Sequence, residues 1–253
     1  MFAAMFVQIL VCVLLLFLLL KRKGGERFTA RAVWKYLLFG ALSYLVLMVV
    51  GLILDVDKTA FWHLDPILAG FLTALLLAAI PEEASKYIFF RLAARKNGEL
   101  VTRHDTVIAA VITAIGFTVM EDIQYAVFGS GNLLRAILPM HLLFQGVMGY
   151  WYGRAKAEGK PFFHVLSVAL PIMLHTLFDM FLIGMMAAIG TDRLTGFDVD
   201  TLTALPYFRY LVPMIGTAVA IMVAGLAGLI ALFVKIGRWK MNGQLQEPLR
   251  KDD

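Results

Sequence analysis

The sequence predicts an all-α polytopic membrane protein, a single bundle of about seven transmembrane helices. Of its 253 residues, 60% are hydrophobic and only 16% are charged, with a mean hydropathy of +0.80. A soluble globular protein is about 45–50% apolar and about 25% charged. The apolar residues also gather into runs long enough to cross a bilayer, which takes about 20 helical residues. Together these features exclude a soluble fold.

The expected spans follow one another with short connections, so we predict one transmembrane domain over residues 1–253 and no soluble domain. The first run is followed by Lys21-Arg22-Lys23 rather than preceded by positive charge, so it is expected to be an uncleaved helix and not a signal peptide. The tail 239–253 is polar and is expected to be loose. The predicted spans are 2–20, 34–54, 66–95, 106–128, 134–152, 162–189 and 207–236.

The distribution of positive charge predicts the orientation of the bundle. All lysines and arginines fall in the odd-numbered connections or the C-terminal tail, except Lys58, Arg135, Arg193 and Arg209. Cytoplasmic loops carry the excess of Lys and Arg. The N-terminus is therefore expected outside and the C-terminus in the cytoplasm. The same placement explains the net charge of +5 without a nucleic-acid partner, so the expected partners are the lipid bilayer and a membrane protein.

One short stretch, Pro81-Glu82-Glu83-Ala84-Ser85-Lys86, places two carboxylates and a lysine inside a predicted span. A carboxylate in hydrocarbon costs at least a few kcal/mol, so an ionisable residue there indicates a functional site. Lys86 is three residues from Glu83 and four from Glu82, which puts it on one side of the helix with either carboxylate. A structural ion pair is the alternative reading.

Other ionisable residues are expected at a similar depth: Glu121, His141 and His175. Counting about 1.5 Å per residue from the cytoplasmic end of each helix places these and Glu82 roughly 20 Å into the membrane. Asp179 is four residues from His175 and can accept its second ring N–H. Asp122 falls on another helix face than Glu121 and is expected to be a packing residue.

Two prolines are expected to kink helices beside these groups. Pro81 directly precedes the glutamate pair, and Pro171 precedes His175 by one turn. Kinked helices beside polar residues suit a water-filled cavity.

The chemistry that these groups allow is activation of water. Two neighbouring carboxylates can supply a general base, and histidine with a further carboxylate can polarise a carbonyl or protonate a leaving amine. Cys12 is the only cysteine, which excludes an intrachain disulfide and a CxxC zinc site. No HExxH motif occurs, but glutamate and histidine suit a divalent metal such as zinc. If a metal is present, we expect Glu82, Glu121, His141 and His175 to hold it.

The motifs Glu82-Glu83-x-x-Lys86, Phe117-x-x-x-Glu121 and His175-x-x-x-Asp179 resemble those of the PrsW family of intramembrane proteases. Three longer strings also look like that family: GFTVMEDIQY (116–125), LPMHLLFQGVMGYWYGRAK (138–156), which contains His141, and MLHTLFDM (173–180). The resemblance covers roughly residues 66–185, in order, and implies a protease core there. It implies an integral protein of the bacterial cytoplasmic membrane, related to the CAAX prenyl endopeptidases and their Abi relatives.

The resemblance also implies roles for the residues. Glu82 would be the general base, with Glu83 assisting or orienting it, and Glu121 would complete the polar cluster. His175 and Asp179 would polarise the scissile carbonyl or position the water, and His141 would be a further active-site ligand. Lys86 and Phe117 would support the site. The substrate would be a membrane-anchored protein such as an anti-sigma factor.

Three alternatives remain at this point. A CAAX-like or Abi protease would use a related site, but the lysine spacing favours PrsW. A proton- or cation-coupled transporter also buries Glu, Asp and His, although the sequence has no inverted repeat. The third is a non-catalytic membrane adaptor.

Overall fold

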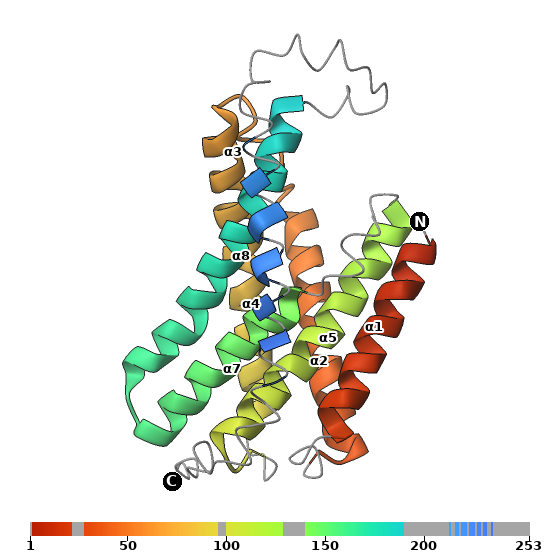
Figure 1. The fold of residues 1–253 in the computed structure, drawn as a ribbon, viewed down its shortest axis with the longest axis vertical. Coiled ribbons are helices and arrows are strands. Elements are labelled where there is room, and N and C mark those ends of the chain that lie inside the picture. The colour runs from red at the N-terminus through yellow and green to blue at the C-terminus, as the bar shows by residue number, and fades with distance from the viewer. Residues whose placement is uncertain are drawn as a thin grey trace.

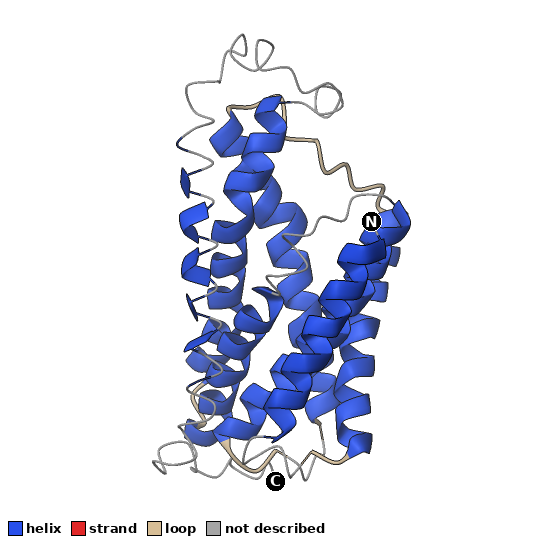
Figure 2. Ribbon diagram, turned by 45° about the vertical axis from the view of Figure 1, so that its right-hand side comes forward, coloured by secondary structure: helices blue, strands red, loops and turns tan. Residues whose placement is uncertain are grey.

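The structure is a computed structural model that describes residues 2–21, 28–95, 100–128, 140–189 and scattered positions between Pro213 and Val234. In these parts of the chain every element is a helix, and the helices run lengthwise beside one another (Figure 2). The elements are α1 (Phe2–Lys21), α2 (Ala30–Ile53), α3 (Pro66–Leu72), η2 (Thr73–Ala79), α4 (Ile80–Ala94), α5 (Arg103–Phe128), α7 (Met140–Glu158) and α8 (Pro161–Ile189).

The observed helices confirm the all-α bundle and most of the predicted spans. Four of the described stretches are long and apolar enough to cross a membrane: 30–53, 66–94, 103–127 and 161–187. The first predicted span corresponds to α1. The seventh lies largely outside the described residues, although the positions described between Pro213 and Val234 are helical. The tail 239–253 lies outside them altogether.

The fifth span was predicted to end at about Tyr152, and α7 continues as a helix beyond it to Glu158. The extension is polar and is held by ion pairs that a hydropathy profile does not register. Arg154 bonds Glu158 one turn later at 2.8 Å, and Arg103 of α5 approaches the same carboxylate at 3.3 Å. The predicted start of this span, at residue 134, lies outside the described residues.

The central helix of the bundle is α5, which is buried along most of its length. Helices α2 and α7 pack against it, and α8 packs against α7. Close packing on α5 depends on glycine: a Cβ on Gly40 of α2 would collide with the Thr113 backbone, and a Cβ on Gly149 of α7 would lie 2.6 Å from the Thr106 carbonyl oxygen. Small residues of this kind let helices approach closely in lipid.

The third span is one continuous rod built from three helical segments. Asp65 caps its start by accepting from the backbone N–H of Ile67 at 3.0 Å. Residues Thr73–Ala79 are π-helical, and the N–H of Ile80 donates to Leu75, five residues back. The chain then returns to α-helix at Ile80. Single π-turns inside α-helices often occur at functional sites. The kink expected at Pro81 stays a prediction.

The segments of this span do not all share one neighbour: α3 and η2 both pack on α8. The upper part in Figure 1, α3, packs on α8, whereas α4 packs mainly on α2. The basic ends of α1, α4 and α7 lie at the same lower end of the bundle as the starts of α2, α5 and α8 (Figure 1). Helix α8 continues through Pro171 as one helix.

Candidate active site

The glutamate pair lies in the first turn of α4, directly after the π-helical stretch. The helical spacing brings Lys86 back onto both carboxylates, as the sequence predicts. The Lys86 Nζ atom is 2.8 Å from Glu83 Oε1 and 3.3 Å from Glu82 Oε2. Lys86 is completely buried, and the ring of Phe117 lies 3.9 Å from its Nζ atom. The lysine is thus held by an aromatic face as well as by charge.

Glu83 has partners on both of its carboxylate oxygens. Its side chain is fully buried. Its Oε1 accepts from Lys86 and faces His175 Nδ1 at 3.0 Å, and its Oε2 accepts from Gln145 Nε2 at 3.0 Å. Glu83 therefore joins three helices: α4, α7 and α8.

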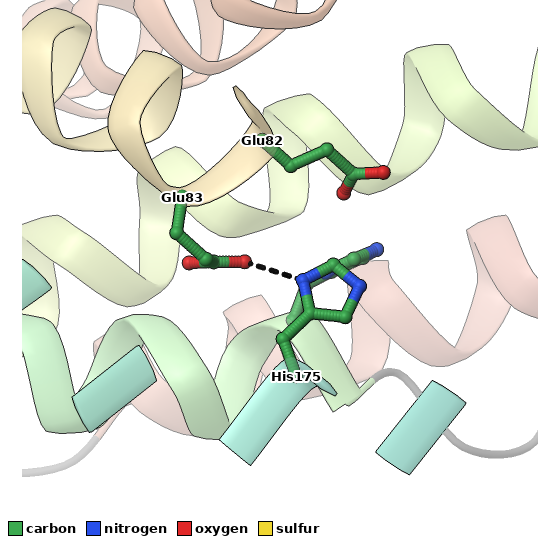
Figure 3. A group of neighbouring side chains, drawn as sticks. Glu82, Glu83 and His175 are labelled. Carbon is green, nitrogen blue, oxygen red and sulfur yellow. Dashed lines mark hydrogen bonds and ion pairs between the residues drawn. The ribbon is translucent and has the colours of Figure 1, made fainter. Parts of the chain in front are cut away.

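Glu82 differs from its neighbour in exposure and in bonding. Its side chain is 14% exposed, and it forms an ion pair with Lys86 at 3.3 Å. Figure 3 shows Glu82 and Glu83 extending from α4 into the space beside His175. Glu82 is thus more open and less tightly held than Glu83.

His175 lies between two carboxylates. Its Nδ1 faces Glu83, and its Nε2 lies 3.1 Å from Asp179, four residues along α8. Phe144 of α7 stacks on the ring, with a centroid distance of 5.2 Å and an interplanar angle of 21°. The ring orientation is therefore determined on both edges and on one face.

His141 repeats this arrangement from α7. Its Nε2 lies 2.8 Å from Glu121 Oε2 on α5, and its Nδ1 lies 3.0 Å from Lys86 Nζ. Each histidine thus has one nitrogen toward the centre of the cluster and the other on a carboxylate. The two imidazole centroids are 5.3 Å apart.

The structure thus brings together all eight residues that the sequence indicated. Asp122 is buried beside Glu121 on α5, but it is placed toward α1, where Cys12 is its electrostatic neighbour. The packing role expected for Asp122 stays a prediction. The eight clustered residues are Glu82, Glu83, Lys86, Phe117, Glu121, His141, His175 and Asp179.

Two residues of the cluster were not predicted. Gln145 donates to Glu83, and its other atom, Oε1, is buried without a hydrogen-bond partner. Phe144 stacks on His175. The sequence offered one indication of Gln145: it is an amide within an expected membrane span, one turn after His141 and on the same helix face.

Four donors could together hold a metal ion: Glu82, Glu83, His141 and His175, with one ligand atom of each lying within 4.8 Å of the others. Two imidazoles and two carboxylates suit zinc. The carboxylates of Glu121 and Asp179 on the outer nitrogens are the partners that metal-binding histidines usually have. The set differs from the expected one in a single member, because Glu121 bonds the outer nitrogen of His141 and Glu83 takes its place.

Comparisons with known proteins point to one family. Residues 29–211 match the family described as "PrsW family intramembrane metalloprotease". "Protease PrsW" of Halalkalibacterium halodurans is 34% identical over 176 residues, which cover 67% of this chain and 78% of that protein. "Protease PrsW" of Clostridioides difficile is 28% identical over 161 residues, covering 58% and 66%. That of Geobacillus kaustophilus is 27% identical over 157 residues, covering 60% and 67%.

No solved structure matches the chain. The family match nevertheless spans most of the bundle, including every residue of the cluster. The relatives are bacterial, and the described helices include four that could cross a membrane. The chain therefore belongs to the PrsW family of intramembrane metalloproteases and is a peptidase of a bacterial membrane.

Proposed function

We propose that this chain cuts membrane-anchored proteins with a water molecule activated by Glu82, while Glu83, His141 and His175 form the rigid wall of the site. The single observation that carries this assignment is the contrast between the two adjacent glutamates. Glu83 is fully buried with donors on both oxygens, whereas Glu82 has one long contact and partial exposure. A general base needs a free lone pair and access to water.

His175 is suited to act on the substrate. Asp179 holds its Nε2, and Phe144 fixes the plane of the ring. The Nδ1 atom thus faces the centre beside Glu83. When zinc is bound, this nitrogen would be a ligand and would carry no proton. When zinc is absent, a proton held there can polarise the scissile carbonyl or pass to the leaving amine. Because Asp179 stabilises the protonated ring, it supports both steps.

The same three side chains could bind zinc. Glu83, His141 and His175 would be three buried protein ligands, with Glu82 at the more open fourth corner. Catalytic zinc sites usually keep three protein ligands and one open position. Bound zinc would supply Lewis-acid polarisation of the peptide carbonyl. Glu121 and Asp179 would orient the two imidazoles.

The test is proteolysis in reconstituted liposomes that contain a panel of single-span membrane proteins, an anti-sigma factor among them. Wild type, Glu82→Ala and His175→Ala are compared with Asp122→Asn, a buried carboxylate placed away from the cluster. Each is assayed with and without a metal chelator. We expect cleavage by wild type and Asp122→Asn only, and loss of cleavage with chelator. Cleavage that survives in Glu82→Ala would refute the role of Glu82, and cleavage that survives the chelator would refute the role of zinc.

A further inference from the structure

The Lys86 ammonium lies at the centre of the cluster in a binding site for a cation, which we call the cation seat. It has three N–H donors, and three acceptors surround it: Glu83 Oε1 at 2.8 Å, Glu82 Oε2 at 3.3 Å and His141 Nδ1 at 3.0 Å. The Phe117 ring lies on a further side at 3.9 Å. The side chain is completely buried. The seat therefore satisfies all the hydrogen-bonding capacity of the ammonium group.

The three acceptors of this seat are also three of the four residues that can hold a metal. A lone pair that accepts from an ammonium cannot at the same time bind a metal ion. Two cations within a few ångströms of each other in a buried site also repel strongly. The ammonium and a divalent metal therefore exclude each other from these donors.

We propose that, in the metal-free protein, the Lys86 ammonium occupies the site where a metal ion would bind, and that metal binds only when the ammonium leaves this site. This inference rests on the zinc site included in the proposed function. It gives the lysine two effects. The buried carboxylates stay neutralised when no metal is present, because an unpaired buried charge is strongly destabilising. The same neutralisation weakens metal binding, because metal has to displace a well-bonded group.

Displacement also determines where the lysine goes. An ammonium deprived of its three acceptors cannot stay buried without new partners. Glu82 is partly exposed, so the seat borders a side of the cluster that solvent can reach. Metal binding should therefore move Lys86 from a protected position to one that water and small reagents can reach.

The first test is zinc affinity, measured in detergent by competition with a chromophoric chelator. The variants are Lys86→Met, which removes the ammonium but keeps the chain length, and Arg91→Met, which removes one charge from the exposed end of the same helix. We expect Lys86→Met to bind zinc at least tenfold more tightly than wild type and Arg91→Met to bind it equally well. Equal or weaker binding by Lys86→Met, or no binding by any of the proteins, would overturn the proposal.

A second measurement uses the wild-type protein and does not depend on how well the variant folds. The protein is treated with an amine-acetylating reagent with and without zinc, and modification is read by peptide mass spectrometry. We expect acetylation of Lys86 to rise at least severalfold with zinc, while that of Lys160, whose side chain is 65% exposed, stays constant. An unchanged rate at Lys86 would contradict displacement. Neither test uses proteolysis, so the exchange of cations can fail while the peptidase assignment stands, and the reverse.

Discussion

Replacing either adjacent glutamate by glutamine should separate catalysis from stability. In Glu83→Gln, the charge is lost at a side chain that is fully buried and contacts Lys86, His175 and Gln145. Removing one partner of a buried ion pair costs about 3–5 kcal/mol. We expect the lower end of that range, because the new amide oxygen can still accept one hydrogen bond.

For a chain of this size, 1 kcal/mol corresponds to about 2–4 °C in Tm. Glu83→Gln should therefore lower the Tm by about 6–12 °C. Glu82→Gln loses only a 3.3 Å contact at a partly exposed side chain, which is worth about 1 kcal/mol or less, so its Tm should fall by at most about 4 °C. Both variants should lose cleavage, Glu82→Gln because the base is gone.

The assay pairs thermal unfolding in detergent with cleavage in liposomes, both on the same preparations. Wild type and Asp122→Asn provide the reference for expression and folding. Equal Tm losses for the two variants, or a larger loss for Glu82→Gln, would refute the contrast in bonding from which their roles are inferred.

Three further predictions follow from other contacts. Glu82→Gln should reduce cleavage at least 100-fold, in line with removal of a general base, whereas Asp122→Asn should change the rate less than tenfold; comparable losses in a single-turnover assay would contradict the assignment. Gln145→Met should slow cleavage, because Glu83 loses a hydrogen-bond donor. The Tm of this variant should change by only a few degrees, because the substitution also removes the buried Oε1 atom that has no partner. A large fall in Tm would show that the amide is mainly structural. Gly40→Ala should destabilise the protein by about 1–3 kcal/mol, because the new Cβ would collide with the Thr113 backbone. Gly51→Ala should be neutral or stabilising, because a Cβ there would have no atom within 4 Å. Thermal unfolding of the two variants side by side checks this difference.

The sequence predicts the helices well because a bilayer imposes its own constraints on length and charge. The spans beginning near Pro66 and Pro161 have clear apolar runs and basic flanks, and their observed bounds agree with the expected ones. Hydropathy does not predict a helix boundary that lies in a polar part of the chain. The last turn of α7, from Arg154 to Glu158, is polar and gives no apolar signal, and the helix ends where Gly159 adopts a positive φ of 66°.

The site was predicted through its ionised groups, because burying them is costly enough to be informative. Counting depth placed Glu82, Glu121, His141 and His175 together. In the structure His141 contacts Glu121 directly, and Lys86 and Glu83 connect this pair to Glu82 and His175. Gln145 and Phe144 could not be found this way, because an uncharged amide and a phenylalanine are ordinary in a membrane helix. Their positions depend on how α7 is rotated against α4 and α8, which is a property of packing.

The π-helical stretch at Thr73–Ala79 also determines the direction in which the catalytic face points. One residue corresponds to about 100° of rotation around an α-helix, and a π-turn accommodates an extra residue in the span. If this stretch were ordinary α-helix, α3 could keep its contact with α8, but Glu82 and Glu83 would point about a quarter turn away from His175. The direction in which the glutamates of the third span point is thus determined by the seven residues before Ile80, a segment that itself has no ionisable side chain.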